Sequence, residues 1–191
     1  MKRQGRPAGQ IRGRWTMVGR SSDPEAERVS DDLRLGDTPA LRRRRWSAGL
    51  MLLALGAYTV VATYQCGLVR HLPEPAQPWL DADRVDASGE AYAVGHTPDT
   101  ALALANAAVT LALIGMGTAD RAIHRPWLPL LAAGKAAGDA AAGAWLFTEQ
   151  LSRHRRICGW CTLAAAATTL AVPFTVREAI QAWHQLRGRR A

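Results

Sequence analysis

The sequence predicts an all-α fold: a four-helix transmembrane bundle with a long outer loop between its first and second helices. A helix needs ~20 residues to cross the hydrocarbon layer of a bilayer. Four runs of about this length carry no charge or almost none: 47–69, 100–119, 126–148 and 157–176. Charged residues, mostly arginine, gather outside these runs. The lengths of the runs and the placing of the charges are the observations behind the predicted fold.

The basic composition is compatible with two classes of partner. A formal net charge of +8 over 191 residues is, by itself, compatible with binding nucleic acid. The basic residues, however, concentrate beside the apolar runs, which is the pattern of membrane proteins. We therefore expect the chain to lie in a membrane and to bind no nucleic acid.

The distribution of Lys and Arg predicts the orientation. Residues 1–45 show no apolar periodicity and are expected to form a disordered basic cytoplasmic head. The membrane domain is then 46–177, and 178–191 is a basic cytoplasmic tail. Apolar residues recur at helical spacing in the tail, as in a helix that lies on a membrane surface. With both termini in the cytoplasm, the head holds 12 Lys and Arg, and the two outer connections hold two and three. We expect a multi-pass protein of the cell membrane.

The first and second runs each have a marked beginning. Four arginines, residues 42–45, and Trp46 precede the first run, as expected for a cytoplasmic anchor and an interfacial aromatic residue. The polar connection 70–99 follows, and a loop of this length is either functional or a simple tether. The second run begins after Asp99.

The third run contains the pair Lys135 and Asp139, which stand one helical turn apart. Charges inside a span are costly and normally face the bundle interior. We favour a structural ion pair over the alternatives, a proton relay or a quinone contact. Gly134 and Gly138 form a GxxxG pattern, which predicts that a neighbouring helix approaches closely there.

Two cysteines, Cys158 and Cys161, stand at the start of the fourth run, after a basic cluster at residues 153–156. In the first turn of a helix, unpaired backbone N–H groups and the helix dipole favour a thiolate. A zinc site would need four ligands, usually as two cysteine pairs, and Cys66 is the only other cysteine. Two inert core cysteines are the remaining alternative. We favour reversible disulfide chemistry.

The position of each cysteine predicts its exposure. Cys158 lies nearest the helix end and close to Arg156, so we expect it to be the more exposed of the pair and the richer in thiolate. Cys161 lies one turn deeper, beside the hydrocarbon layer. Cys66 lies in the last turn of the first run, and we expect it to be buried and dispensable, because free cysteines usually behave as small apolar side chains.

Four segments in this order resemble the vitamin K epoxide reductase family, and its bacterial members in particular. The resemblance extends roughly from Trp46 to Trp183. The four segments are the exit from the first helix, part of the outer loop, the entry to the second helix and the start of the CxxC helix: YQCGLVRHLP at 64–73, DADRVDAS at 81–88, TPD at 97–99 and RHRRICGWCTL at 153–163.

The resemblance implies quinone-coupled thiol–disulfide exchange in a membrane. By resemblance, Cys161 faces a menaquinone-type quinone, and Cys158 exchanges with a soluble thioredoxin-like partner. Ser88 matches the family's loop serine and, by resemblance, is a catalytic residue together with the two cysteines. Asp99 stands where the family often has an asparagine that binds a quinone oxygen.

The sequence also departs from the family pattern. The family relays electrons through two loop cysteines, but Ala82 stands at the second of these positions and residues 70–99 contain no cysteine. Ala165 stands where the family often has a quinone-contacting tyrosine. A catalytically degenerate family member that acts as a membrane scaffold or quinone-binding subunit is therefore the alternative function.

Overall fold

The computed structural model describes residues 23–188, and this part of the chain is helical, with no β-strand. The predicted all-α class is confirmed. The elements are α1 (Pro24–Leu35), α2 (Pro39–Gln65), α3 (Ala82–Asp86), the 3₁₀-helix η1 (Gly89–Tyr92), α4 (Asp99–Gly115), α5 (Arg121–His124), α6 (Trp127–Glu149), the π-helix η2 (Gln150–His154) and α7 (Gly159–Gly188).

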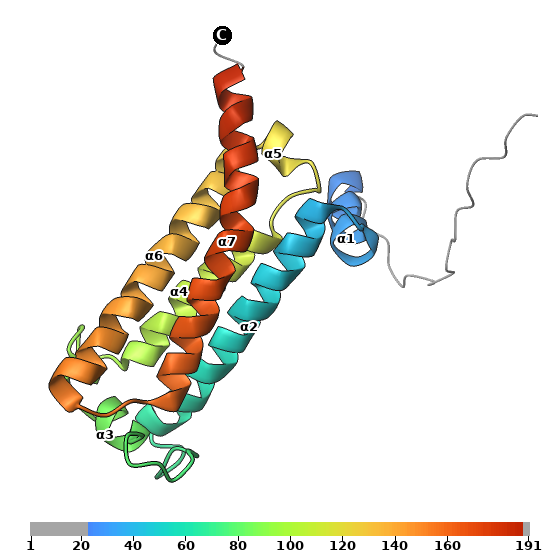
Figure 1. Cartoon of the computed structure of the whole chain (residues 1–191). Coiled ribbons are helices and arrows are strands. Elements are labelled where there is room, and N and C mark those ends of the chain that lie inside the picture. The colour runs from blue at the N-terminus through green and yellow to red at the C-terminus, as the bar shows by residue number, and fades with distance from the viewer. Residues whose placement is uncertain (1–22, 189–191) are drawn as a thin grey trace, which may run out of the picture.

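Four of these helices, each of 17 residues or more, lie side by side (Figure 1). Helix α7 packs against α2 and α6, and α4 packs against the same two helices, so the four close into a bundle. Two of them, α2 and α7, are long and apolar enough to cross a membrane, and α4 is a shorter apolar helix. The connection between α2 and α4, which contains α3, lies at one end of the bundle, and α5 lies at the other (Figure 1).

The head is more ordered than the sequence predicted. Asp23 caps α1 by accepting the N–H of Glu25, and Thr38 caps α2 by accepting the N–H of Leu41 at 3.2 Å. Pro39 supplies a first residue whose fixed φ suits a helix start. Disorder over residues 24–35 and 39–45 is therefore a wrong prediction, because local capping starts both helices before the apolar run. The remainder of the predicted head, residues 1–22, lies outside the described residues.

The tail also differs from its prediction. Helix α7 continues without interruption through Pro173 to Gly188, and it projects beyond the bundle (Figure 1). It therefore does not turn aside at residue 177 as a separate helix. A prolyl ring removes one helical hydrogen bond, but the flanking turns of α7 still continue.

Small side chains set the spacing of the helices. Four alanines of α2 and α7 form one buried cluster: Ala54, Ala57, Ala164 and Ala167. A Cβ added at Gly143 of α6 would lie 3.3 Å from the Cβ of Ala165, so this glycine permits the close approach of α6 to α7. The GxxxG prediction is wrong, because a Cβ added at Gly134 or Gly138 would have no atom of a neighbouring helix within 4 Å.

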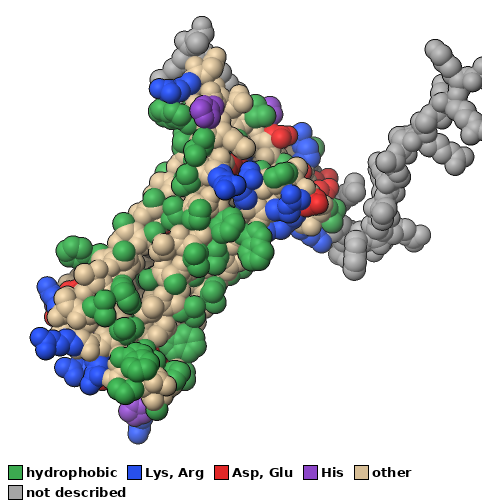
Figure 2. Space-filling model, viewed as in Figure 1, with side chains coloured by type: hydrophobic (Ala, Val, Ile, Leu, Met, Phe, Trp, Pro, Cys, Tyr) green, Lys and Arg blue, Asp and Glu red, His purple; other side chains and the backbone are tan. Residues whose placement is uncertain are grey.

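The outer surface of the bundle is apolar. Figure 2 shows hydrophobic side chains along the shaft and charged side chains toward its two ends. Large apolar residues of all four long helices are exposed, and Trp145 is exposed to 73%. The set includes Leu52, Leu53, Leu102, Val109, Leu131, Leu146, Leu163 and Leu170. Water would disfavour such a surface, whereas hydrocarbon would not.

A buried ion network joins the helices at the α5 end. The carboxylate of Glu178 in α7 accepts hydrogen bonds from Arg44 of α2 and from Arg121 of α5, with the Arg121 Nη2 to Oε2 distance at 2.8 Å. Arg121 also donates to three backbone carbonyls at the end of α4. All three side chains are nearly fully buried. The network therefore ties α2, α4, α5 and α7 together.

A second polar cluster lies between α4 and α6. Lys135 and Asp139 form the expected ion pair, with Nζ and Oδ1 2.5 Å apart. Asp139 also accepts hydrogen bonds from Asn106 and Thr110 of α4. These contacts satisfy both charges, which agrees with the structural interpretation of the pair.

Candidate functional site

Cys158 is the residue immediately before α7, and it caps that helix. Its Sγ accepts the backbone N–H of Cys161 at 3.2 Å, and its own N–H donates to Oε1 of Gln150 at 3.0 Å. The chain reaches this position through a turn at Arg155, whose φ of 51° is left-handed. Both cysteines thus lie at the N-terminal end of α7.

The outer loop folds back over this helix start. Trp79 accepts the N–H of Ile157, and the N–H of Asp81 donates to the carbonyl of Ile157, which forms an isolated bridge. Glu74 accepts the N–H of Gly159 through Oε1 at 2.5 Å. The connection 70–99 therefore positions the site, and it is not merely a tether.

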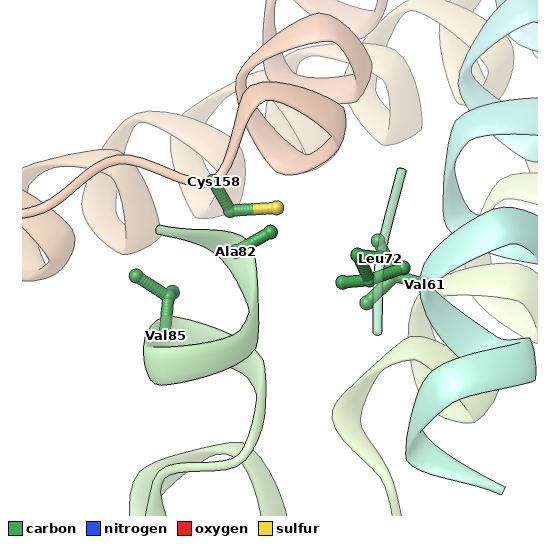
Figure 3. Packing of buried hydrophobic residues seen from close by; sticks show 5 residues of the cluster. All are labelled: Val61, Leu72, Ala82, Val85 and Cys158. Carbon is green, nitrogen blue, oxygen red and sulfur yellow. The ribbon is translucent and has the colours of Figure 1, made fainter. Parts of the chain in front are cut away.

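This covering reverses the predicted exposure of the two cysteines. Cys158 is 0% exposed, whereas Cys161 is half-buried. Figure 3 shows the Cys158 side chain next to Ala82 and pointing toward Leu72 and Val61, which belong to the same buried cluster. The prediction that Cys158 is the more exposed cysteine is wrong, because the loop packs onto it.

Asp86, at the end of α3, completes the group. The Sγ of Cys161 donates to Oδ1 of Asp86 at 3.3 Å. Asp86 is only 2% exposed, and its Oδ2 atom has no hydrogen-bond partner among the described residues. Burial raises the pKa of the Asp86 carboxyl to about 6, although hydrogen bonds from Cys158 and Cys161 act in the opposite direction.

Asp86 was not identified from the sequence. It lies in the segment that resembles the family's outer loop, but an Asp among other Asp residues in a polar loop is normally exposed. The one signal beside Asp86 in the sequence is the apolar residue Val85, which suggests that part of this segment packs inward. Val85 is buried in the structure, so one face of the short helix does pack inward.

A small cavity of about 80 Å³ lies beside Cys161 and Asp86, which form part of its wall. Ser88 and Asp99, the two other predicted site residues, also line it, whereas Cys158 does not. Its apolar lining includes Tyr58, Ala103, Leu146, Phe147 and Ala165. The fold thus brings three of the four predicted site residues, Cys161, Ser88 and Asp99, to one cavity. The fourth, Cys158, does not line the cavity but contacts Cys161.

Asp99 is held in place from α2. Its Oδ1 accepts a hydrogen bond from Nε2 of Gln65 at 2.8 Å, and Oε1 of Gln65 in turn accepts from the backbone N–H of Thr100. Gln65 also donates to the backbone carbonyl of Asp86 at 3.3 Å. One buried glutamine therefore fixes both carboxylate-bearing segments of the cavity wall.

Cys66 lies apart from this site. It is the C-cap of α2, and its side chain is exposed rather than buried. The prediction of a buried Cys66 is wrong, because α2 ends at Gln65 and the chain then turns through Gly67, whose φ is 75°. Cys66 belongs neither to the cavity lining nor to the cluster around Cys158.

The sulfur atoms and Asp86 could also be considered as metal ligands. Ligand atoms of Asp86, Cys158 and Cys161 lie within 4.8 Å of one another. Structural zinc sites use four protein ligands, and this group supplies three. Its cysteine pair therefore suits disulfide chemistry better than a closed metal site.

Fold and site together define an α-helical bundle with two helices long and apolar enough to cross a membrane, in which a CxxC motif borders a cavity at one end. The family model of the vitamin K epoxide reductase family matches residues 45–176, well over half of the chain. The chain therefore belongs to the vitamin K epoxide reductase family, and the resemblance found in the sequence is confirmed. Members of this family are generally oxidoreductases associated with membranes and quinones. Comparison with curated proteins and with solved structures found no match.

Proposed function

We propose that this protein is a membrane thiol–disulfide oxidoreductase that couples the Cys158–Cys161 pair to a membrane quinone. The observation that carries the proposal is the juxtaposition at the start of α7: two cysteines, one of them in the wall of a cavity, with the other at its back. A dithiol that forms a disulfide releases two electrons and two protons. A quinone that is reduced to a quinol takes up both.

The lining of the cavity suits the headgroup of a menaquinone-type quinone, because most of it is apolar. The cavity volume of about 80 Å³ is below the ~300–1,000 Å³ of ordinary ligand pockets, so the cavity has to widen when a quinone enters. The hydroxyl of Ser88, which contacts the Glu90 carboxylate, also lines the cavity and is a hydrogen-bond donor for a quinone oxygen there. Asp99 could donate only in its protonated form, because a carboxylate has no proton to share. We therefore assign Ser88 and Asp99 to quinone binding, with Ser88 as the principal donor.

The same proposal includes a topology of four membrane spans, formed by α2, α4, α6 and α7. The exposed apolar side chains along the shaft support it, as does the neutralised Lys135–Asp139 pair inside α6. Both termini then lie in the cytoplasm, and the outer loop lies on the opposite side with the cysteines. That side is oxidising in bacteria, which permits a disulfide to persist.

The two cysteines have different partners in this scheme. Cys161 borders the cavity and serves the quinone, whereas Cys158 exchanges with a thioredoxin-like protein. Because Cys158 is fully buried, a protein thiol reaches it only after the outer loop has moved away from α7. Loop opening is therefore a required step of protein exchange.

One observation favours the second candidate function, a scaffold or quinone-binding subunit without catalysis. Ala82 stands at the position of the family's second loop cysteine, and it packs against Cys158 with no thiol to offer. A chain that had lost the relay and kept the fold would have this arrangement.

Turnover by the purified protein separates the two functions. The protein in lipid nanodiscs is supplied with a dithiol donor and a short-chain menaquinone, and quinol formation is followed by absorbance. We expect quinol formation with the unsubstituted chain and with Cys66→Ser, but none with Cys158→Ser or Cys161→Ser. Equal rates in all four chains, or no rate above the protein-free background in any, would instead support the scaffold.

A further inference from the structure

We propose that Asp86 is a catalytic residue, the group that accepts the thiol proton of Cys161 when the Cys158–Cys161 disulfide forms. The inference rests on the proposed function and adds to it the route of one proton. No sequence motif pointed to Asp86, and its role is inferred from its placement.

The first argument is geometric. Oδ1 of Asp86 already accepts the Cys161 S–H at 3.3 Å, so transfer of that proton needs no rearrangement. Oδ2 has no partner among the described residues, and Asp86 lines the cavity. One carboxylate thus contacts the reacting sulfur and also borders the proposed quinone site. Gln65 holds the backbone of Asp86 from the α2 side, which keeps the carboxylate in position.

The second argument is the lack of a structural reason for a charge here. Asp86 takes part in none of the ion pairs found in residues 23–188. A buried carboxylate without a cation is costly to ionise. The titratable groups near it are mainly acids and thiols: Cys158 immediately before α7, Cys161 from α7, Glu74 and Glu90 from the loop, Asp99 from α4, Glu149 from α6, His154 from η2 and Tyr58 from α2.

These surroundings suit a group that takes up and releases protons. Burial, together with the negative charges of Asp99 and Glu74, raises the pKa of Asp86 to about 6. A general base is most effective when its pKa lies near the working pH. At neutral pH Asp86 is mostly ionised and can accept a proton, and it is basic enough to do so more readily than an exposed carboxylate.

The reaction balances with Asp86 as carrier. The S–H bond of Cys161 breaks and its proton binds Asp86. The S–S bond to Cys158 forms as two electrons pass to the quinone of the proposed function. The proton on Asp86 is then released into the cavity, where one of the two protons taken up in quinone reduction is needed. The second proton, from Cys158, is balanced through the solvent. Asp86 returns to its carboxylate form.

Asp86→Asn separates this role from a merely structural one. Asparagine has nearly the same shape, and its carbonyl oxygen can still accept the Cys161 S–H, but it cannot take up the proton. Asp86→Glu keeps the acid. The first measurement needs no quinone: the alkylation rate of Cys161 is followed over pH 5 to 9 in a Cys66→Ser, Cys158→Ser background.

In the chain that keeps Asp86, we expect the alkylation rate of Cys161 to rise with pH in two steps. The first step has its midpoint near pH 6, where Asp86 ionises, and the second lies at higher pH, where the thiol itself ionises. Asp86→Asn should lose the first step, and Asp86→Glu should retain it. Quinol formation by the chain with both cysteines should fall roughly 100-fold or more in Asp86→Asn, since general acid–base catalysis typically contributes that much.

A chain that keeps Asp86 but shows no step near pH 6 would overturn the inference, even if Asp86→Asn failed to fold. So would quinol formation within twofold of normal, with an unchanged pH profile, in Asp86→Asn. Failure of the proposed function is distinguishable, because the unsubstituted chain would then form no quinol whatever the alkylation profile of Cys161.

Discussion

The contact of Glu74 with the start of α7 predicts that a single substitution in the loop will expose Cys158. Oε1 of Glu74 accepts the N–H of Gly159 at 2.5 Å, and Oε2 accepts the N–H of Ala82 at 2.8 Å. This one side chain therefore joins the first part of the loop to α3, which lies further along the same loop, and to α7. Glu74→Ala removes both hydrogen bonds, while the Trp160 to Pro73 hydrogen bond remains.

The size of the effect follows from the two bonds. A hydrogen bond to a charged group contributes about 1.5–3 kcal/mol, and Glu74 is half-buried, so the lower value applies to each. The loss of about 3 kcal/mol corresponds to roughly a 100-fold larger population of the opened loop. Glu74→Gln keeps one acceptor, so about a 10-fold increase is expected. Gly159→Ala should have a smaller effect, because the added Cβ would meet only the flexible end of the Glu74 side chain, with Oε1 2.9 Å away.

The alkylation rate of Cys158 measures this opening. In a Cys66→Ser, Cys161→Ser background, Cys158 is the only thiol, and its rate is compared with that of the unfolded chain. The control is Glu25→Ala, which removes an exposed glutamate that pairs with Arg125, the residue after α5, at the other end of the bundle. The rates should rise in the order unsubstituted chain, Glu74→Gln, Glu74→Ala. Equal alkylation rates in all three chains would refute the inference that Glu74 holds the outer loop against α7.

Three further outcomes are expected. Glu178→Ala leaves two buried arginines unpaired and should lower the free energy of unfolding by about 3–5 kcal/mol in detergent micelles; a loss below about 1 kcal/mol would contradict this. Cys66→Ser should keep normal quinol formation, because Cys66 is exposed and outside the cavity; loss of activity at normal expression would make Cys66 a shuttle. Ala82→Cys should form a disulfide with Cys158 on mild oxidation, detectable by mass spectrometry, because the two side chains are in one packed cluster; its absence would argue against that packing.

The positions of the helices could be predicted because apolar runs and charges are sharply separated along the chain. Their ends could not be predicted as well. The helix α2 begins at Pro39, before its apolar run, because Thr38 caps it. The helix α4 ends at Gly115 rather than at residue 119, since Met116 is extended and Gly117 has a φ of 85°. Capping and turn geometry, and not hydrophobicity, decided both boundaries.

The site could be predicted only in part, for a related reason. The CxxC motif and its place at a helix start were visible in the sequence, and so was Asp99. The burial of Cys158 and the contact between Cys161 and Asp86 depend on how a 30-residue loop folds back on the bundle. The periodicity of the sequence carries no information on that contact. As a result, Cys158 is the covered cysteine and Cys161 the more accessible one, which is the reverse of the prediction.

The redox state of the cysteine pair after one exposure to quinone tests the central claim most directly. The reduced protein in nanodiscs, in the Cys66→Ser background, is mixed anaerobically with one equivalent of a menaquinone, quenched with an alkylating reagent in denaturant, so that buried thiols also react, and weighed by mass spectrometry. The claim predicts that both Cys158 and Cys161 escape alkylation until a reductant is added, with one quinol formed per disulfide. Full alkylation of both cysteines, with the quinone still oxidised, would contradict it.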